Sequence, residues 1–87
     1  MPNPVNPSST DPHDELRAFG EALAEARLTR NLDRTVMARQ LTLSLQQIQQ
    51  IEEGGDSAFY SLHHKQLAAR KVAAFLQVAW PPAGDDA

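Results

Sequence analysis

Apolar residues recur every three or four positions along most of the chain, and this spacing places them on one face of an α-helix. The segments that show this pattern are 14–30, 33–41, 44–53 and 62–76. A chain of this length can bury only one small core, so these helices must share it. The pattern predicts an all-α fold, a bundle of four or five helices.

Two of these segments form a connected pair with clear start and stop signals. Asp33 and Ser44 are suited to cap helices, because their side-chain oxygens can accept hydrogen bonds from the free amides of a first turn. Gly54 is expected to end the second helix, since glycine adopts a left-handed conformation at little cost. Only Thr42 and Leu43 separate the two helices. A connection that short predicts a helix-turn-helix motif.

The predicted contact between these two helices combines a small residue with an apolar stripe. Ala38 permits close approach of the second helix, whose stripe contains Leu45, Ile48 and Ile51. We expect Ala38, Ile48 and Ile51 to be buried together. Segment 44–53 would then be held out as a rigid rod that faces water.

Three aromatic residues follow the motif. Phe59 and Tyr60 are expected to close one end of the core. Trp80 is expected either to pack back onto the domain or to form an exposed contact. Packing is the favoured alternative, because a small domain gains much from burying one indole.

Composition limits the classes of function. The chain has 87 residues, a hydrophobic fraction of 41% and no cysteine, which allows one core without disulfides or thiol chemistry. No apolar run is long enough to span a bilayer and no signal peptide is recognisable, so a cytoplasmic protein is expected. We expect a disordered proline-rich tail at 1–13, a domain at 14–80 and a flexible acidic tail at 81–87.

The distribution of charge argues against a strongly basic nucleic-acid binder. The net charge is −3, but three of the acidic residues, Asp11, Asp85 and Asp86, lie in the predicted tails, so segment 14–80 is neutral. Segment 45–53 contains no lysine or arginine. Phosphate contacts supply most non-specific affinity for DNA, so any DNA binding is predicted to be weak and salt-sensitive.

An ordered set of residues in segment 19–54 matches a known family. The set is Phe19, Gly20, Leu23, Arg27, Asn31, Leu32, Asp33, Met37, Ala38, Leu41, Ser44, Ile48 and Ile51–Gly54. With these residues the segment resembles the helix-turn-helix family of lambda repressor, Cro and their bacterial relatives, the XRE family. It looks especially like the RodZ-like branch, the N-terminal domain of a cytoskeletal adaptor, in which an aromatic linker and a further helix follow the glycine.

The resemblance implies a DNA-binding, transcriptional regulator-like module that acts as a homodimer on double-stranded DNA. The second helix of the motif would enter the major groove, where a glutamine amide can bond bidentately to adenine. The candidate base-contacting residues are Leu45, Gln46, Gln47 and Gln50. The candidate phosphate-contacting residues are Arg34, Arg39 and Arg30. The resemblance also implies a structural ion pair between Arg27 and Glu52.

The RodZ-like branch implies an alternative, a protein-interaction domain that does not read DNA. Its characterised members bind the actin-like filament protein MreB through the last helix and the aromatic loop. The candidate contact residues at comparable positions of this chain are Phe59, Tyr60, Lys65, Arg70 and Lys71. Leu45 and Glu53 favour this alternative, because many DNA-binding relatives carry a polar and a basic residue there. The sequence leaves both interpretations open.

Catalysis and metal binding are not predicted. His63 and His64 are adjacent, so on a helix they point about 100° apart and do not easily grip one ion. Ser57 and Ser61 lack the strand-to-helix turn that exposes a catalytic serine, and no glycine-rich phosphate cradle is present. We therefore expect a binding module with no cofactor, no catalytic residue and no small-molecule substrate.

Overall fold

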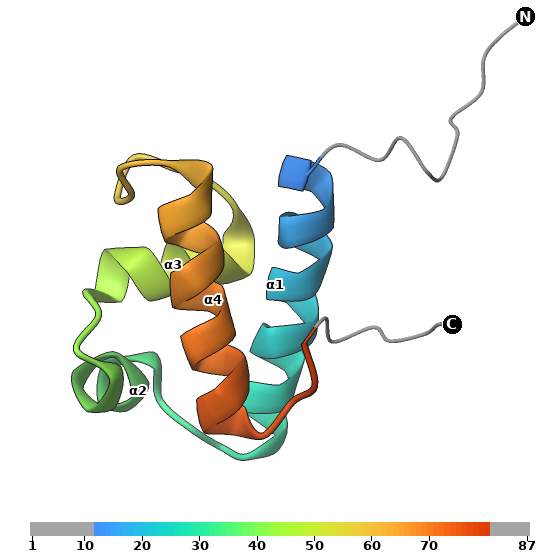
Figure 1. Ribbon diagram of the computed structural model, residues 1–87. Coiled ribbons are helices and arrows are strands. Elements are labelled where there is room, and N and C mark those ends of the chain that lie inside the picture. The colour runs from blue at the N-terminus through green and yellow to red at the C-terminus, as the bar shows by residue number, and fades with distance from the viewer. Residues whose placement is uncertain (1–11, 81–87) are drawn as a thin grey trace, which may run out of the picture.

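A computed structural model describes residues 12–80, which form four α-helices and contain no strand (Figure 1). The helices are α1 (Pro12–Thr29), α2 (Arg34–Leu41), α3 (Leu45–Glu53) and α4 (Leu62–Leu76). In Figure 1, α1 and α4 lie side by side and α3 crosses behind them, while α2 lies at one end of the bundle. The predicted all-α fold with a helix-turn-helix is therefore confirmed.

The first helix begins earlier than the sequence pattern indicated. Most of the predicted tail 1–13 and the whole of 81–87 lie outside the described residues, but Pro12 and His13 belong to the first turn of α1. Proline suits the first position of a helix, because its missing amide hydrogen would have no partner there. Asp14 lies inside the first turn, where its negative charge is favoured by the positive end of the helix.

One hydrophobic core joins all four helices. Its buried members are Leu16, Leu23, Met37, Ala38, Ile48, Ile51, Ala68, Ala69, Val72, Ala73 and Leu76. The predicted joint burial of Ala38, Ile48 and Ile51 is confirmed. The many alanines of α4 let that helix pack closely against its neighbours. Among the described residues, no helix has the length and apolar character needed to cross a membrane.

Both predicted caps of the helix-turn-helix are present. The Asp33 side chain accepts a hydrogen bond from the backbone amide of Thr35 at 2.8 Å. Ser44 forms a reciprocal pair with Gln47: the Ser44 hydroxyl accepts from the Gln47 amide at 3.0 Å, and the Gln47 side chain accepts from the Ser44 amide at 2.9 Å. This arrangement satisfies two free amides at the start of α3.

The aromatic residues have different fates. Phe59 packs against the core, as expected, but Tyr60 is 96% exposed and does not close it. Trp80 folds back onto the domain, where its ring meets that of Phe19 edge to face at 5.1 Å. The expectation of packing for Trp80 is thus confirmed, and that for Tyr60 is wrong because the loop before α4 turns its ring outward against His64.

The turn between α2 and α3 contains a strained residue. Thr42 has φ 58° and ψ 41°, the left-handed conformation, which costs a residue with a Cβ about 1–2 kcal/mol. We expect Thr42→Gly to raise the free energy of unfolding by about 1 kcal/mol in urea denaturation. The matched control is Thr35→Gly inside α2, which should lower it by about 1 kcal/mol. Loss of stability in Thr42→Gly would contradict the turn described here.

Candidate functional site

The exposed face of α3 is smaller than the sequence indicated. Leu45, Gln46 and Gln49 are exposed, and they form the outward surface of the helix with Glu53. Of the predicted base-contacting residues, Leu45 and Gln46 are therefore accessible. Gln47 and Gln50 are only half exposed and point toward the loop that follows the helix.

The side chains of Gln47 and Gln50 hold the loop between α3 and α4. The Gln47 amide donates to the Ala58 carbonyl at 3.2 Å. The Gln50 amide donates to the Ser57 hydroxyl at 2.7 Å, and its oxygen accepts from the Ala58 amide at 2.9 Å. In this arrangement both side chains are engaged in the fold, and their predicted base contacts stay a prediction. The Ser44-x-x-Gln47 spacing is a signal for the cap at the start of α3 but not for these loop contacts.

Arg27 and Glu52 form the buried ion pair that the family resemblance implied. The guanidinium donates from Nε to Oε2 at 2.7 Å and from Nη2 to Oε1 at 3.1 Å. Its remaining nitrogen Nη1 donates to the Leu32 carbonyl at 2.8 Å. The buried pair ties α1 to α3, and the bond to Leu32 ties α1 to the connection that precedes α2.

Arg34 is held by two carboxylates of α3. It donates from Nε to Glu52 Oε1 at 2.8 Å and from Nη2 to Glu53 Oε2 at 2.7 Å. The bond from Arg34 lowers the pKa of Glu53, and the bond to Glu53 raises the pKa of Arg34. The contribution of this pair is complete above the ordinary carboxyl pKa and is lost as the pH falls through the lowered value.

The Arg34 guanidinium is already paired with carboxylates, and its predicted phosphate contact stays a prediction. Two guanidinium groups, those of Arg27 and Arg34, face two carboxylates, so the cluster is neutral. The other two predicted phosphate contacts are exposed. Arg30 donates to the Ala26 carbonyl of its own helix, and the guanidinium of Arg39 makes no hydrogen bond or ion pair within residues 12–80. Only Arg39 is thus available without a prior partner.

Lys65 is buried, contrary to its assignment as a protein-contact residue. It is only 5% exposed, and its Nζ donates to the Gly55 carbonyl at 2.8 Å and to Asp56 Oδ1 at 3.0 Å. The lysine ties the loop at Gly55 and Asp56 to the first turn of α4. Its charge can be buried because the carbonyl and the carboxylate replace the hydrogen bonds that water would provide. The chain's local pattern carried no signal for this inward orientation.

The outer α4 face carries both apolar and basic groups. We define this face as His63, Leu67, Arg70, Lys71, Ala74 and Phe75, all of which are exposed. Leu67 is 49% exposed and Phe75 is 38% exposed. Lys71 lies over the helix-turn-helix, where its Nζ reaches the Leu41 carbonyl at 3.3 Å. No residue of α4 is acidic, so the face has a positive charge.

The two histidines of α4 do not point to a common ligand. The His64 ring accepts at Nδ1 from the Tyr60 amide at 3.2 Å and stacks on the Tyr60 ring at 5.1 Å. His63 instead faces the hollow between α1 and α4. Over residues 12–80, no three histidine or acidic side chains gather in a way that could hold a metal ion.

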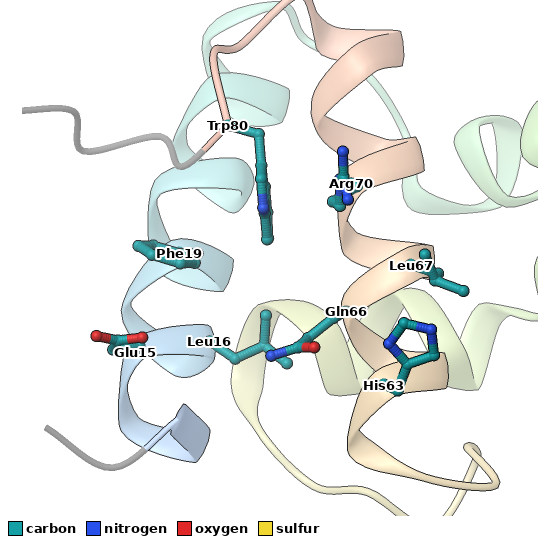
Figure 2. Close-up of a pocket in the computed structure, with 8 residues that line it drawn as sticks. All are labelled: Glu15, Leu16, Phe19, His63, Gln66, Leu67, Arg70 and Trp80. Carbon is teal, nitrogen blue, oxygen red and sulfur yellow. The ribbon is translucent and has the colours of Figure 1, made fainter.

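A hollow of about 370 Å³ lies between α1, α4 and Trp80 (Figure 2). Its walls contain both ring systems of the Phe19–Trp80 pair and polar side chains from α4. The helical spacing of the sequence does not predict this hollow. The hollow depends on where Trp80 packs after the end of α4, and the spacing of apolar residues does not specify that position.

Comparison with known proteins identifies no relative. No family model matches the chain, and no curated protein sequence or solved structure matches it. The resemblance to the XRE and RodZ-like helix-turn-helix proteins therefore stays a prediction.

Proposed function

We propose that this chain is a non-enzymatic protein-interaction module whose outer α4 face binds an acidic partner protein. The observation that carries the proposal is the exposure of Leu67 and Phe75 beside Arg70 and Lys71, on a helix without any acidic residue. This is the alternative of the two functions that the sequence left open.

The composition of the outer α4 face suits a protein contact. Burial of apolar surface is worth about 25 cal/mol per Å², so covering Leu67 and Phe75 would contribute directly to binding. Aromatic and arginine side chains also supply a large share of binding energy at protein interfaces. The cations Arg70 and Lys71 would select a partner with carboxylates opposite them and would speed association.

The helix-turn-helix face is less suited to DNA than the sequence suggested. Its α3 contains no cation, and Arg34 is already bonded to two carboxylates. A DNA phosphate would have to displace Glu53 and would meet its negative charge. Since phosphate contacts dominate non-specific DNA affinity, this neutral face favours weak binding.

DNA binding as a transcriptional regulator is the second candidate. The exposed amides of Gln46 and Gln49 on the outward side of α3 favour it, because glutamine can recognise adenine in the major groove. Arg39 would supply a phosphate contact. A homodimer would be needed, since one neutral domain offers few contacts.

Photo-crosslinking distinguishes the two candidates. A photoreactive amino acid would be placed at Phe75 on α4 or at Gln46 on α3, in cells that naturally produce the chain. We expect the crosslinker at position 75 to form discrete protein adducts, in which the attached partner residues lie next to Asp or Glu. The crosslinker at position 46 should form few adducts with protein or DNA. Arg70→Glu should reduce the adducts at position 75 at least about tenfold, the effect of about 1.4 kcal/mol.

A matched charge reversal controls for general electrostatic effects. Arg39→Glu changes the net charge equally but lies on α2, so it should leave the adducts at position 75 unchanged. The purified chain would also be titrated with mixed-sequence duplex DNA at low salt. DNA adducts at position 46, or salt-sensitive binding that Arg39→Glu weakens, would contradict the protein-contact proposal and favour the second candidate.

A further inference from the structure

The hollow between α1 and α4 has the size and lining of a small-ligand site. Its volume of about 370 Å³ lies in the range of pockets that hold small organic molecules, about 300–1,000 Å³. Leu16 and Leu67 provide aliphatic walls, and Phe19 and Trp80 provide aromatic walls. In Figure 2 the indole of Trp80 stands in the space between Phe19 and Arg70. An aromatic ring could therefore pack on the indole from the side of α4.

The polar groups of the hollow favour an anion. Arg70 is exposed at its rim, and its guanidinium makes no hydrogen bond or ion pair with any residue of segment 12–80. Gln66, one turn earlier on α4, and His63, two turns earlier, are further polar side chains in the lining. The carboxylate in the lining, Glu15, is drawn in Figure 2 on the side of α1 away from Arg70. An incoming carboxylate would thus meet the guanidinium before it meets a like charge.

We propose that this hollow binds a small aromatic monocarboxylate, with the ring against Trp80 and the carboxylate on Arg70. A guanidinium matches a carboxylate with two parallel hydrogen bonds, which makes the contact both strong and directional. The hollow shares His63, Leu67 and Arg70 with the outer α4 face, but its ligand requires no partner protein, because the isolated chain would recognise it. No chemical conversion is involved.

Trp80 reports on the site directly, because it is the sole tryptophan of the chain. Its fluorescence would be followed during titration with phenylbutyrate, with phenylbutanol, which lacks the charge, and with phenylbutylamine, which reverses it. We expect a saturable change with the acid and about tenfold weaker binding of the alcohol, the effect of one charge-assisted contact. The amine should bind more weakly than the alcohol.

Arg70→Gln is expected to remove the preference for the acid, so that the acid and the alcohol bind equally. Arg39→Gln is the matched control, since that exposed arginine lies on α2, and it should keep the tenfold preference. Amide chemical shifts should change around the hollow. The absence of a saturable response to the acid, equal binding of acid and alcohol by the unmodified chain, a preference for the amine, or shifts centred on another surface would each overturn the proposal.

Discussion

Gly20→Ala is expected to destabilise the domain by roughly 3 kcal/mol, although alanine favours helix formation more than glycine does. The reason is the contact between α1 and α3. A Cβ at Gly20 would overlap the backbone carbonyl oxygen of Ile51, and a Cβ could not relieve this by a change of rotamer. The two helices would have to move apart and open the core at Leu23 and Ile48.

Urea denaturation followed by circular dichroism and by Trp80 fluorescence would measure this effect. Ala18→Gly is the matched control, because Ala18 lies on the exposed side of the same helix. It should cost about 1 kcal/mol through helix propensity alone. If Gly20→Ala were as stable as the unmodified chain, the close approach of α1 and α3 would be wrong.

The backbone of this fold was largely predictable, because its signals are local. Asp33 and Ser44 mark the starts of α2 and α3 by side-chain chemistry that acts within one helical turn. The positive φ of Asn31, 57°, agrees with the tolerance of asparagine for the left-handed conformation. Gly54 also has a positive φ, 110°, but its extended ψ places it outside the left-handed helical region that was expected.

The candidate site was less predictable, because its contacts join residues that are far apart in sequence. Arg34 is 18 positions before Glu52 and 19 positions before Glu53 in the sequence. The two ion pairs therefore form only after α2 has packed against α3. Helical spacing placed Leu67 and Phe75 among the apolar residues of α4. They are nevertheless 49% and 38% exposed, because the core accepts only the alanine-rich side of that helix. Periodicity identifies a face but not how deeply it is covered.

These differences also explain why a protein contact on α4 is now favoured over DNA binding by α3. The glutamines of α3 and Arg34 suggested DNA as long as their side chains were considered free. Three of those side chains have partners inside the domain, whereas Arg70 and Phe75 on α4 face water. Both helices expose apolar surface, Leu45 on α3 and Leu67 and Phe75 on α4, but only on α4 do cations stand beside it without acidic neighbours on the same helix. This difference in charge favours α4 as the surface for an acidic partner.

Glu52→Gln is expected to destabilise the domain by about 3 kcal/mol, since it removes the charge shared by two guanidinium groups. Glu52 is 4% exposed and accepts from both Arg27 and Arg34. A neutral amide in its place would leave the Arg27 charge buried, and one of the amide hydrogens would face a guanidinium donor. The neighbouring Glu53→Gln is the matched control: it makes the same chemical change at an exposed site and should alter stability little.

A double variant distinguishes two costs: the loss of the ion pair itself, and the burial of one charge that no longer has an opposite charge beside it. Arg27→Met combined with Glu52→Leu removes both buried charges, so it should recover much of the stability that Glu52→Gln loses, because apolar side chains of similar volume can replace a buried pair. Arg34 keeps Glu53 as a partner in this variant. Urea denaturation of the three variants would test this order. Equal losses for Glu52→Gln and Glu53→Gln would show that the carboxylate of Glu52 is not buried between α1 and α2.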